Sequence, residues 1–200
     1  MKIGVLASGS GTNFQAIIDA IKADKISNSS IEILICNRKS AFALERAKME
    51  GIEAVYLNGK EFETREEYDK KVVAVLKEKG VELVVLAGYL RWITPYFVES
   101  FRDKIINIHP SLLPSFKGLH GIEQAHEYGV KVTGVTVHFV DETEDGGAVI
   151  AQEPVIIENG ESIEKLEEKI HAVEHKLYPY VIELINKGKV KKNNRIVKII

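Results

Sequence analysis

Cysteine is nearly absent from this chain of 200 residues, in which Cys36 is the only one. A single cysteine excludes an internal disulfide framework and a cysteine-rich metal site. Cys36 lies in an apolar segment, so we expect a small buried side chain and not a reactive nucleophile. The shortage of cysteine favours the reducing cytoplasm as the compartment.

Long apolar runs and an excess of basic residues are also missing. No segment approaches the run of about eighteen apolar residues that a membrane-spanning helix needs, and no targeting segment is recognisable at the start. The formal net charge is −2, which provides no basic field for a nucleic acid. We therefore expect neither membrane nor nucleic-acid binding, while a local loop could still hold one phosphate.

What is present is an alternation of short apolar segments and amphipathic segments. Hydrophobic residues make up 45% of the chain, enough for a well-filled core. The patterns predict strands and helices in alternation, with strands at 2–7, 31–36, 53–57, 82–87 and 104–108 and helices at 13–21, 41–49 and 66–79. This order predicts an α/β fold with an open, mostly parallel, Rossmann-like sheet flanked by helices.

The pattern changes after Pro114. The apolar segments 131–140 and 148–157 have no helix between them and predict an antiparallel extension of the sheet at the C-terminal side. Residues 162–185 predict one long helix, and the tail 188–200 predicts a small hairpin about Asn193-Asn194. No repeat or linker marks a second domain, so we expect a single domain over residues 1–200.

A glycine loop, Ser8-Gly-Ser-Gly-Thr-Asn13, lies between the first strand and the first helix. Glycine lets the backbone approach an anion, and a helix start offers N–H groups and a positive dipole end. A dinucleotide site is disfavoured because Phe14 stands where a third glycine is needed, and Asn37-Arg38 where an acidic residue would bind ribose. The loop fits one phosphate monoester best, and a plain tight turn is the alternative.

A second polar pattern is Asn107-Ile-His109 at the end of the predicted fifth strand, followed by Pro110. Residues two apart on a strand point to one face. An amide donor beside an imidazole suits a carbonyl that becomes an oxyanion. Taken alone, the pattern is more typical of a strand end with a structural histidine.

The segment Asn107–Gly118, with His138-Phe-Val140 and Asp145-Gly-Gly147, resembles the folate-dependent formyltransferase superfamily. The loop Ala7–Asn13 is similar to that of the branch which formylates glycinamide ribonucleotide in purine synthesis. The similarity runs roughly from Lys2 to Leu184. It implies transfer of a formyl group from 10-formyltetrahydrofolate, the co-substrate, to the amine of N1-(5-phospho-D-ribosyl)glycinamide, without a metal, by a monomer or homodimer whose partners are these two small molecules.

The resemblance also implies roles for single residues. Asn107 would donate a hydrogen bond to the oxyanion, a protonated His109 would support that charge, and Asp145 would orient the ring and favour its protonated form. The substrate would be held by Gly11, Thr12, Asn13 and Glu174. The folate would be held by Arg65, Leu90, Arg91, Trp92, Ile93, Asn107, Val140 and Asp141. Residues 1–100 would then be the nucleotide- and phosphate-binding half, and 101–200 the folate-binding and catalytic half.

Three alternatives remain open at this stage. His171-Ala-Val-Glu174-His175 matches a zinc-protease pattern, but the spacing nominates no third ligand, so a half-exposed helix face is the simpler interpretation. Methionyl-tRNA formyltransferases and formyltetrahydrofolate hydrolases resemble the same Asn-His-Asp core, and both carry additional domains. A non-catalytic nucleotide-binding module is the third, and the joint presence of Asn107, His109 and Asp145 argues against it.

Overall fold

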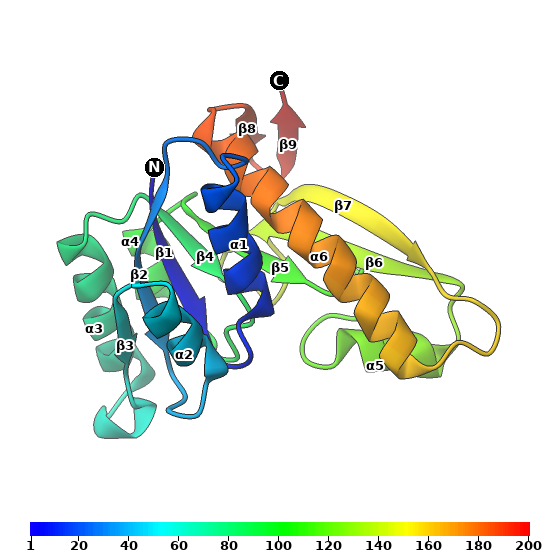
Figure 1. Ribbon diagram of the computed structural model, residues 1–200, viewed down its shortest axis with the longest axis horizontal. Helices are drawn as coiled ribbons and strands as arrows, with labels where there is room; N and C mark the ends of the chain where they lie inside the picture. The colour runs from blue at the N-terminus through cyan, green and yellow to red at the C-terminus, as the bar shows by residue number, and fades with distance from the viewer. The chain divides into compact units, whose positions relative to one another are not determined.

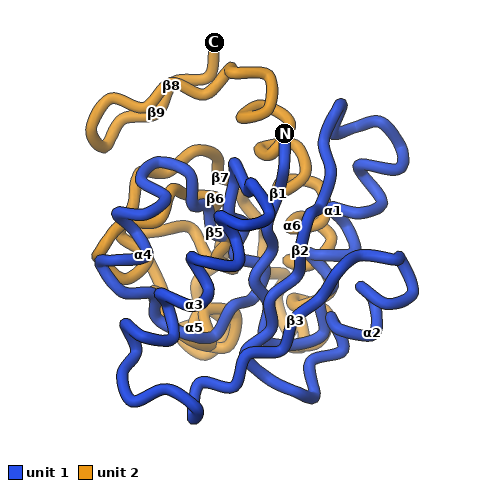
Figure 2. The backbone as a smooth tube through the Cα atoms, turned by 90° about the vertical axis from the view of Figure 1, so that its left-hand side faces the viewer, with its two compact units in different colours: residues 1–107 blue, residues 108–200 orange.

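Five parallel strands form the sheet of a first unit, which spans Met1–Asn107 in the computed structural model of residues 1–200 (Figures 1 and 2). Their order is β3-β2-β1-β4-β5. The bounds of β1 to β5 are Lys2–Ala7, Ser30–Cys36, Ala54–Tyr56, Leu83–Leu86 and Ile105–His109, so that β5 begins in the first unit and ends at the start of the second. All of β4 is buried, and so is β1 except its first residue, as expected for parallel strands covered on both faces.

Helices cover the two faces of this sheet, with α1 and α2 on one side and α3 and α4 on the other (Figure 2). The bounds of α1, α2, the short 3-10 turn η1, α3 and α4 are Thr12–Lys22, Phe42–Met49, Gly59–Glu61, Arg65–Glu78 and Pro95–Ser100. Thr64 caps α3 because its hydroxyl accepts a hydrogen bond from the Glu67 N–H at 3.1 Å. Neither η1 nor α4 was predicted, since both are too short to show a helical period.

The second unit spans Ile108–Ile200 and contains an antiparallel strand pair (Figure 1). Its elements α5, β6, β7, α6, β8 and β9 have the bounds Gly121–Tyr128, Val132–Phe139, Val149–Ile156, Ile163–Asn186, Val190–Asn193 and Ile196–Ile199. β6 pairs with β7 from Val132 opposite Ile156 onward, with a register shift between Val137 and His138. The predicted antiparallel strands are therefore confirmed, and α5 is an element that the sequence analysis missed.

The long helix α6 packs on β6, β7 and α5 (Figure 1). Its buried stripe is apolar, except at Glu174, which is 6% exposed. The stripe comprises Leu166, Ile170, Glu174, Tyr178, Pro179, Val181, Ile182 and Leu184. Ser162 caps its start, accepting a hydrogen bond from the Lys165 N–H at 3.5 Å.

The tail forms the predicted hairpin, with β8 antiparallel to β9 and with β9 in contact with β7. Asn193 pairs with Ile196, so the two turn residues are Asn194 and Arg195, one residue later than predicted. Asn194 has a φ of 53°, a left-handed conformation that asparagine tolerates and that tight hairpin turns require.

The predicted α/β class is confirmed, with mostly parallel strands flanked by helices and antiparallel strands toward the C-terminus. The chain divides into its two compact units after Asn107. That the chain folds as one domain stays a prediction. None of the helices has both the length and the apolar character needed to cross a membrane.

Candidate functional site

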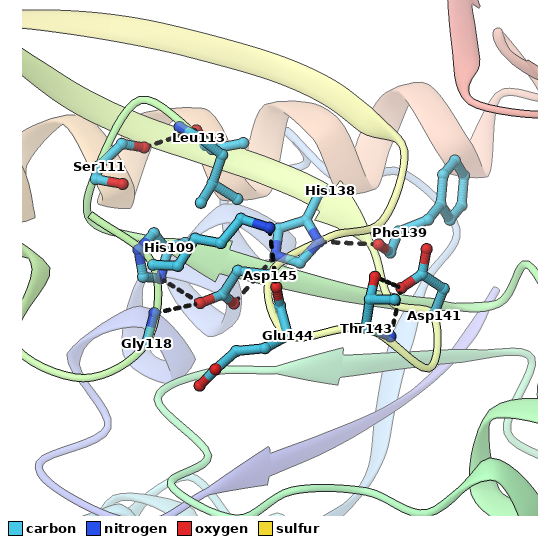
Figure 3. Close-up of polar contacts among 12 residues, drawn as sticks. His109, Ser111, Leu113, Gly118, His138, Phe139, Asp141, Thr143, Glu144 and Asp145 are labelled. Carbon is cyan, nitrogen blue, oxygen red and sulfur yellow. Dashed lines mark hydrogen bonds and ion pairs between the residues drawn. The ribbon is translucent and has the colours of Figure 1, made fainter. Parts of the chain in front are cut away.

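Asp145 lies between two histidine rings in the second unit (Figure 3). Its Oδ2 is 3.4 Å from Nδ1 of His109, and its Oδ1 is 3.8 Å from Nε2 of His138. The backbone N–H of Gly118 donates a hydrogen bond to Oδ2 at 2.8 Å. The two histidine side chains are 5% and 3% exposed, and that of Asp145 is 13% exposed. The structure thus brings together His109 and Asp145, the pair that the resemblance implied.

Both ring nitrogens of His109 face acceptors. Nε2 lies 2.7 Å from the carbonyl oxygen of Phe116, and since a carbonyl can only accept, Nε2 carries the proton of this hydrogen bond. Nδ1 faces the Asp145 carboxylate, which when ionised also only accepts. The His109 ring is therefore held between a backbone carbonyl and a carboxylate.

His138 also lies between a backbone carbonyl and the Asp145 carboxylate. Its Nδ1 lies 2.8 Å from the carbonyl oxygen of Phe139 and donates to it. Burial lowers the pKa of the His138 imidazole below its ordinary value and outweighs the Phe139 carbonyl and the Asp145 carboxylate, which act the other way. We therefore assign a neutral ring to His138 at pH 7. The sequence analysis gave His138 no role; its signal was a histidine within the apolar strand that leads to the Asp145 loop.

Asn107 precedes His109 by two residues on the same strand, β5. The strand alternation places both side chains on one face. Asn107 is partly buried and lies opposite Leu86 of β4 in the parallel pairing. The strand ends at His109, because Pro110 follows and cannot donate to the ladder.

The loop that carries Asp145 needs its two glycines. Asp145 itself has a φ of 43°. A Cβ on Gly146 would lie 1.9 Å from Oγ1 of Thr143, and a Cβ on Gly147 would lie 1.7 Å from the carbonyl oxygen of Phe139. The Asp-Gly-Gly pattern therefore has a steric cause, since only glycine lets the chain fold this closely behind the carboxylate.

The glycine loop of the first unit ends at the N-terminus of α1. Gly11 is the residue before the helix and has a φ of 71°. A Cβ there would lie 2.7 Å from Cβ of Ala43. The first turn of α1 holds no acidic residue, which leaves its positive dipole end uncompensated, and Thr12 and Asn13 are its first two residues. This is the arrangement that suits a phosphate.

A cation that the sequence analysis did not nominate lies at the same loop. Nε of Arg46 donates a hydrogen bond to the Ser10 carbonyl oxygen at 2.8 Å. Its guanidinium also lies 5.1 Å from the centre of the Phe42 ring. Arg46 therefore braces the loop from α2 and adds positive charge beside it.

The segment after β4 presents two large apolar side chains to solvent, since Leu90 and Trp92 are 49% and 50% exposed. The Leu90 N–H donates to the Ser8 hydroxyl at 2.7 Å, which ties this segment to the end of β1. Arg91 packs its guanidinium 4.0 Å from the centre of the Tyr68 ring. Exposed apolar side chains on a braced segment suit a flat heterocycle.

The other residues implied for folate binding are spread over both units. Ile93 is partly buried in the segment after β4, and Arg65 is the exposed first residue of α3. Val140 and Asp141 follow β6 in the second unit, where Val140 is partly buried and Asp141 is exposed. The Asp141 carboxylate accepts hydrogen bonds from the N–H and the hydroxyl of Thr143, at 2.8 and 2.5 Å.

The zinc-like pattern lies on α6, where His171 is exposed and stacks its ring 6.3 Å from that of His175. No group of three or more histidine, cysteine, aspartate or glutamate side chains is placed to hold a metal ion. Cys36 is buried, as predicted, and burial raises the pKa of its thiol to about 12, which disfavours the reactive thiolate. Glu174, on the same helix, is almost fully buried. Carboxylates are rarely buried so deeply for packing alone, so Glu174 is a candidate binding residue.

Comparison with known proteins agrees with these features. The model of the formyl transferase family matches residues 1–182. The phosphoribosylglycinamide formyltransferase of Bacillus subtilis is 41% identical over 182 residues, covering 91% of this chain and 93% of that protein. Its counterpart in Escherichia coli is 41% identical over 191 residues, with 96% and 90% covered.

The chain also matches part of longer proteins, and it superposes on solved structures over its whole length. It is 41% identical over 189 residues to the human trifunctional purine biosynthetic protein adenosine-3, and it spans 19% of the length of that protein. Glycinamide ribonucleotide transformylase 1 from Symbiobacterium toebii superposes with a TM-score of 0.97 at 41% identity, covering 100% of this chain and 94% of that one. The chain therefore belongs to the formyl transferase family, and within it to the phosphoribosylglycinamide formyltransferases.

Proposed function

We propose that this chain transfers the formyl group of 10-formyltetrahydrofolate to the amine of glycinamide ribonucleotide, giving the N-formyl product and tetrahydrofolate in de novo purine synthesis. The observation that carries the proposal is the buried contact between His109 and Asp145, at 3.4 Å. His109 lies on β5, the strand that also bears Asn107. These are the groups that direct attack on a formyl carbon requires: an oxyanion donor, a cation and a carboxylate that maintains the cation.

The amine attacks the formyl carbon directly, and the carbonyl oxygen becomes an oxyanion. The Asn107 amide donates a hydrogen bond to it, and the His109 imidazolium stabilises it through its charge while Nε2 stays on the Phe116 carbonyl. A donor of this kind is worth about 10²–10³ in turnover. A water molecule carries the proton from the attacking amine to the leaving nitrogen of the folate, so no covalent enzyme intermediate forms.

Gly11, Thr12 and Asn13 hold the 5′-phosphate of the substrate. The left-handed Gly11 and the uncompensated N-terminus of α1 support this assignment, since backbone N–H groups there suit a dianion. Glu174 binds the ribose hydroxyls, for which a buried carboxylate is a strong acceptor.

The folate site uses Leu90, Arg91, Trp92 and Ile93 for the pterin, together with Asn107, Val140 and Asp141. The half-exposed Leu90 and Trp92 support this, because they are large apolar side chains without a complete cover. Arg65 pairs with the carboxylate tail of the folate, as an exposed cation at the start of α3 can do.

The remaining properties follow from the same reaction. Direct attack needs neither a metal nor a cysteine nucleophile. The ligands are two small molecules, so we expect no nucleic acid or membrane partner. We expect a cytoplasmic protein that works as a monomer or homodimer, with residues 1–200 as one formyltransferase domain.

A panel of acceptors tests the function. The protein is incubated with 10-formyltetrahydrofolate and either glycinamide ribonucleotide, methionyl-tRNA or buffer alone, and the formylated products and free formate are quantified by mass spectrometry. We expect N-formyl glycinamide ribonucleotide as the dominant product. Formate released equally in all three mixtures would indicate a hydrolase, and formyl-methionyl-tRNA as the main product would indicate the tRNA-directed enzyme.

A further inference from the structure

The C-terminal hairpin β8–β9 begins after residue 182, where the family match ends. It has no part in the function proposed above, yet it contacts the loop that carries Asp145. Nη1 of Arg195, in the hairpin turn, donates a hydrogen bond to the carbonyl oxygen of Gly146 at 2.6 Å. Gly146 directly follows Asp145, so a cation from the tail binds the backbone one residue beyond the carboxylate.

A second contact holds the other end of the same loop. Nζ of Lys192 lies 5.5 Å from the centre of the Phe139 ring, within the range of a cation–π interaction. Phe139 is the last residue of β6. The hairpin therefore contacts the loop at its start, through Phe139, and at its end, through Gly146.

Inside the loop the hydrogen bonds are few and local. The Gly146 N–H donates to the Thr143 carbonyl at 3.2 Å, and the Thr143 N–H donates to the Asp141 carboxylate at 2.8 Å. Lys117 donates to the Glu144 carbonyl at 3.3 Å, which is a long contact. Both Arg195 and Lys117 are charged donors from outside the loop, and the bond from Arg195 is the shorter of the two.

The conformation held in this way is one that the chain does not favour by itself. Asp145 has a φ of 43°, in the left-handed region that costs energy for a residue with a Cβ. If the Gly146 peptide were released, Asp145 could relax to negative φ, and its carboxylate would then leave the position between His109 and His138.

We propose that the β8–β9 hairpin clamps the loop 140–147, and that Arg195 is a positioning residue for Asp145. The proposal deepens the proposed function, since it rests on Asp145 acting in formyl transfer. Arg195 touches no substrate in this account; it acts by keeping the Gly146 carbonyl in place and with it the carboxylate beside His109.

Three variants test the clamp: Arg195→Ala, the conservative Arg195→Lys, and the matched control Lys198→Ala, which removes an exposed cation from the same hairpin. Two readouts are compared with the wild-type protein. The first is kcat and KM for each substrate. The second is hydrogen–deuterium exchange of the backbone amides of residues 140–147, which needs no activity.

We expect Arg195→Ala to lower kcat about three- to tenfold, the effect of losing one charge-assisted hydrogen bond that acts indirectly. KM for glycinamide ribonucleotide should stay the same, and exchange in the loop should accelerate. Arg195→Lys should restore most of kcat because lysine keeps a cationic donor, and Lys198→Ala should match the wild-type protein in both readouts.

Unchanged loop exchange in Arg195→Ala would overturn the clamp, whatever the activity. Faster exchange with unchanged kcat would overturn the positioning role of Arg195. A wild-type protein without formyl transfer would overturn the proposed function instead, and the exchange comparison would still decide whether the hairpin holds the loop.

Discussion

Oδ2 of Asp145 lies 3.4 Å from Nδ1 of His109, and the same oxygen accepts the Gly118 N–H at 2.8 Å. The carboxylate thus has two partners, the titratable imidazole of His109 and the backbone amide of Gly118. The hydrogen bond from the Gly118 amide holds the carboxylate in place beside the imidazole ring. Because both side chains are almost fully buried, the pair is screened little by solvent, and losing either partner leaves the other uncompensated.

The phosphate assignment can be tested at Gly11. We expect Gly11→Val to weaken glycinamide ribonucleotide binding by about 2 kcal/mol or more, roughly thirtyfold, with folate binding nearly preserved. Gly11 has a φ of 71°, and its missing Cβ would lie 2.7 Å from Ala43, so a side chain there displaces the loop. Titration calorimetry with each ligand measures both affinities.

Gly51→Val is the matched control for Gly11. Gly51 has a φ of 66°, close to that of Gly11, but no atom lies within 4 Å of the position of its Cβ. Gly51→Val therefore introduces the same backbone strain as Gly11→Val, but its side chain meets no neighbouring atom. Gly51 is also not among the predicted substrate-binding residues. An equal loss of nucleotide affinity in both variants would show that the effect is general destabilisation and would remove Gly11 from the substrate site.

A stability test addresses the turn behind Asp145. Gly147→Ala should lower the free energy of unfolding by about 1–3 kcal/mol, the usual cost of overpacking, because the added methyl group meets the backbone carbonyl of Phe139 at 1.7 Å. Urea unfolding measures the difference. Gly9→Ala serves as the control, since nothing lies within 4 Å of its Cβ position, and a Gly147 variant as stable as that control would mean that the turn is not as tight as described.

The buried His138 predicts a pH dependence of stability. Burial lowers its pKa in the folded state, so the folded protein binds fewer protons than the unfolded chain just below pH 6.5, the ordinary value. Stability from this group is thus complete above about pH 6.5 and is lost as the pH falls through that value toward the folded pKa. The charged or titratable groups that act on the ring are Asp145, Asp141 and His109.

We therefore expect the free energy of unfolding of the wild-type protein to fall between about pH 7 and about pH 5 by more than that of His138→Gln. The exposed His171→Gln is the control and should follow the wild-type curve. Parallel curves for the wild-type protein and His138→Gln would show that the folded protein does not disfavour the charged ring.

Metal independence is a further expectation. Direct attack by an amine needs no Lewis acid. The side chains of His171, Glu174 and His175 are not placed to hold a metal ion together. Activity should survive dialysis against a chelator, and metal analysis of the purified protein should find well under one zinc per chain. Loss of turnover on chelation with recovery on adding zinc would contradict this.

The sequence predicted those elements whose pattern is local. The apolar segment 82–87 contains β4, and the helical period of residues 162–185 corresponds to α6. The short helices α4 and α5 were missed because six and eight residues make only about two turns, too few to show a helical period. The Asp-Gly-Gly and Asn-x-His patterns pointed to the site because their backbone demands are local as well.

What could not be predicted depends on contacts between distant residues. Asp69 is 1% exposed on the inward face of α3, because its carboxylate accepts the Thr94 N–H at 2.6 Å, 25 residues away. Arg195 reaches Gly146 across 49 residues. No periodicity in the sequence encodes such pairs.

The central claim is that Asn107, His109 and Asp145 carry out formyl transfer, and turnover of the three alanine variants tests it most directly. Product formation from 10-formyltetrahydrofolate and glycinamide ribonucleotide is measured beside calorimetric binding of the ribonucleotide. We predict that each variant loses about two or more powers of ten in kcat while ribonucleotide affinity changes little. A His109→Ala protein that keeps more than about half of the wild-type turnover would contradict the account, because the expected loss is about two powers of ten.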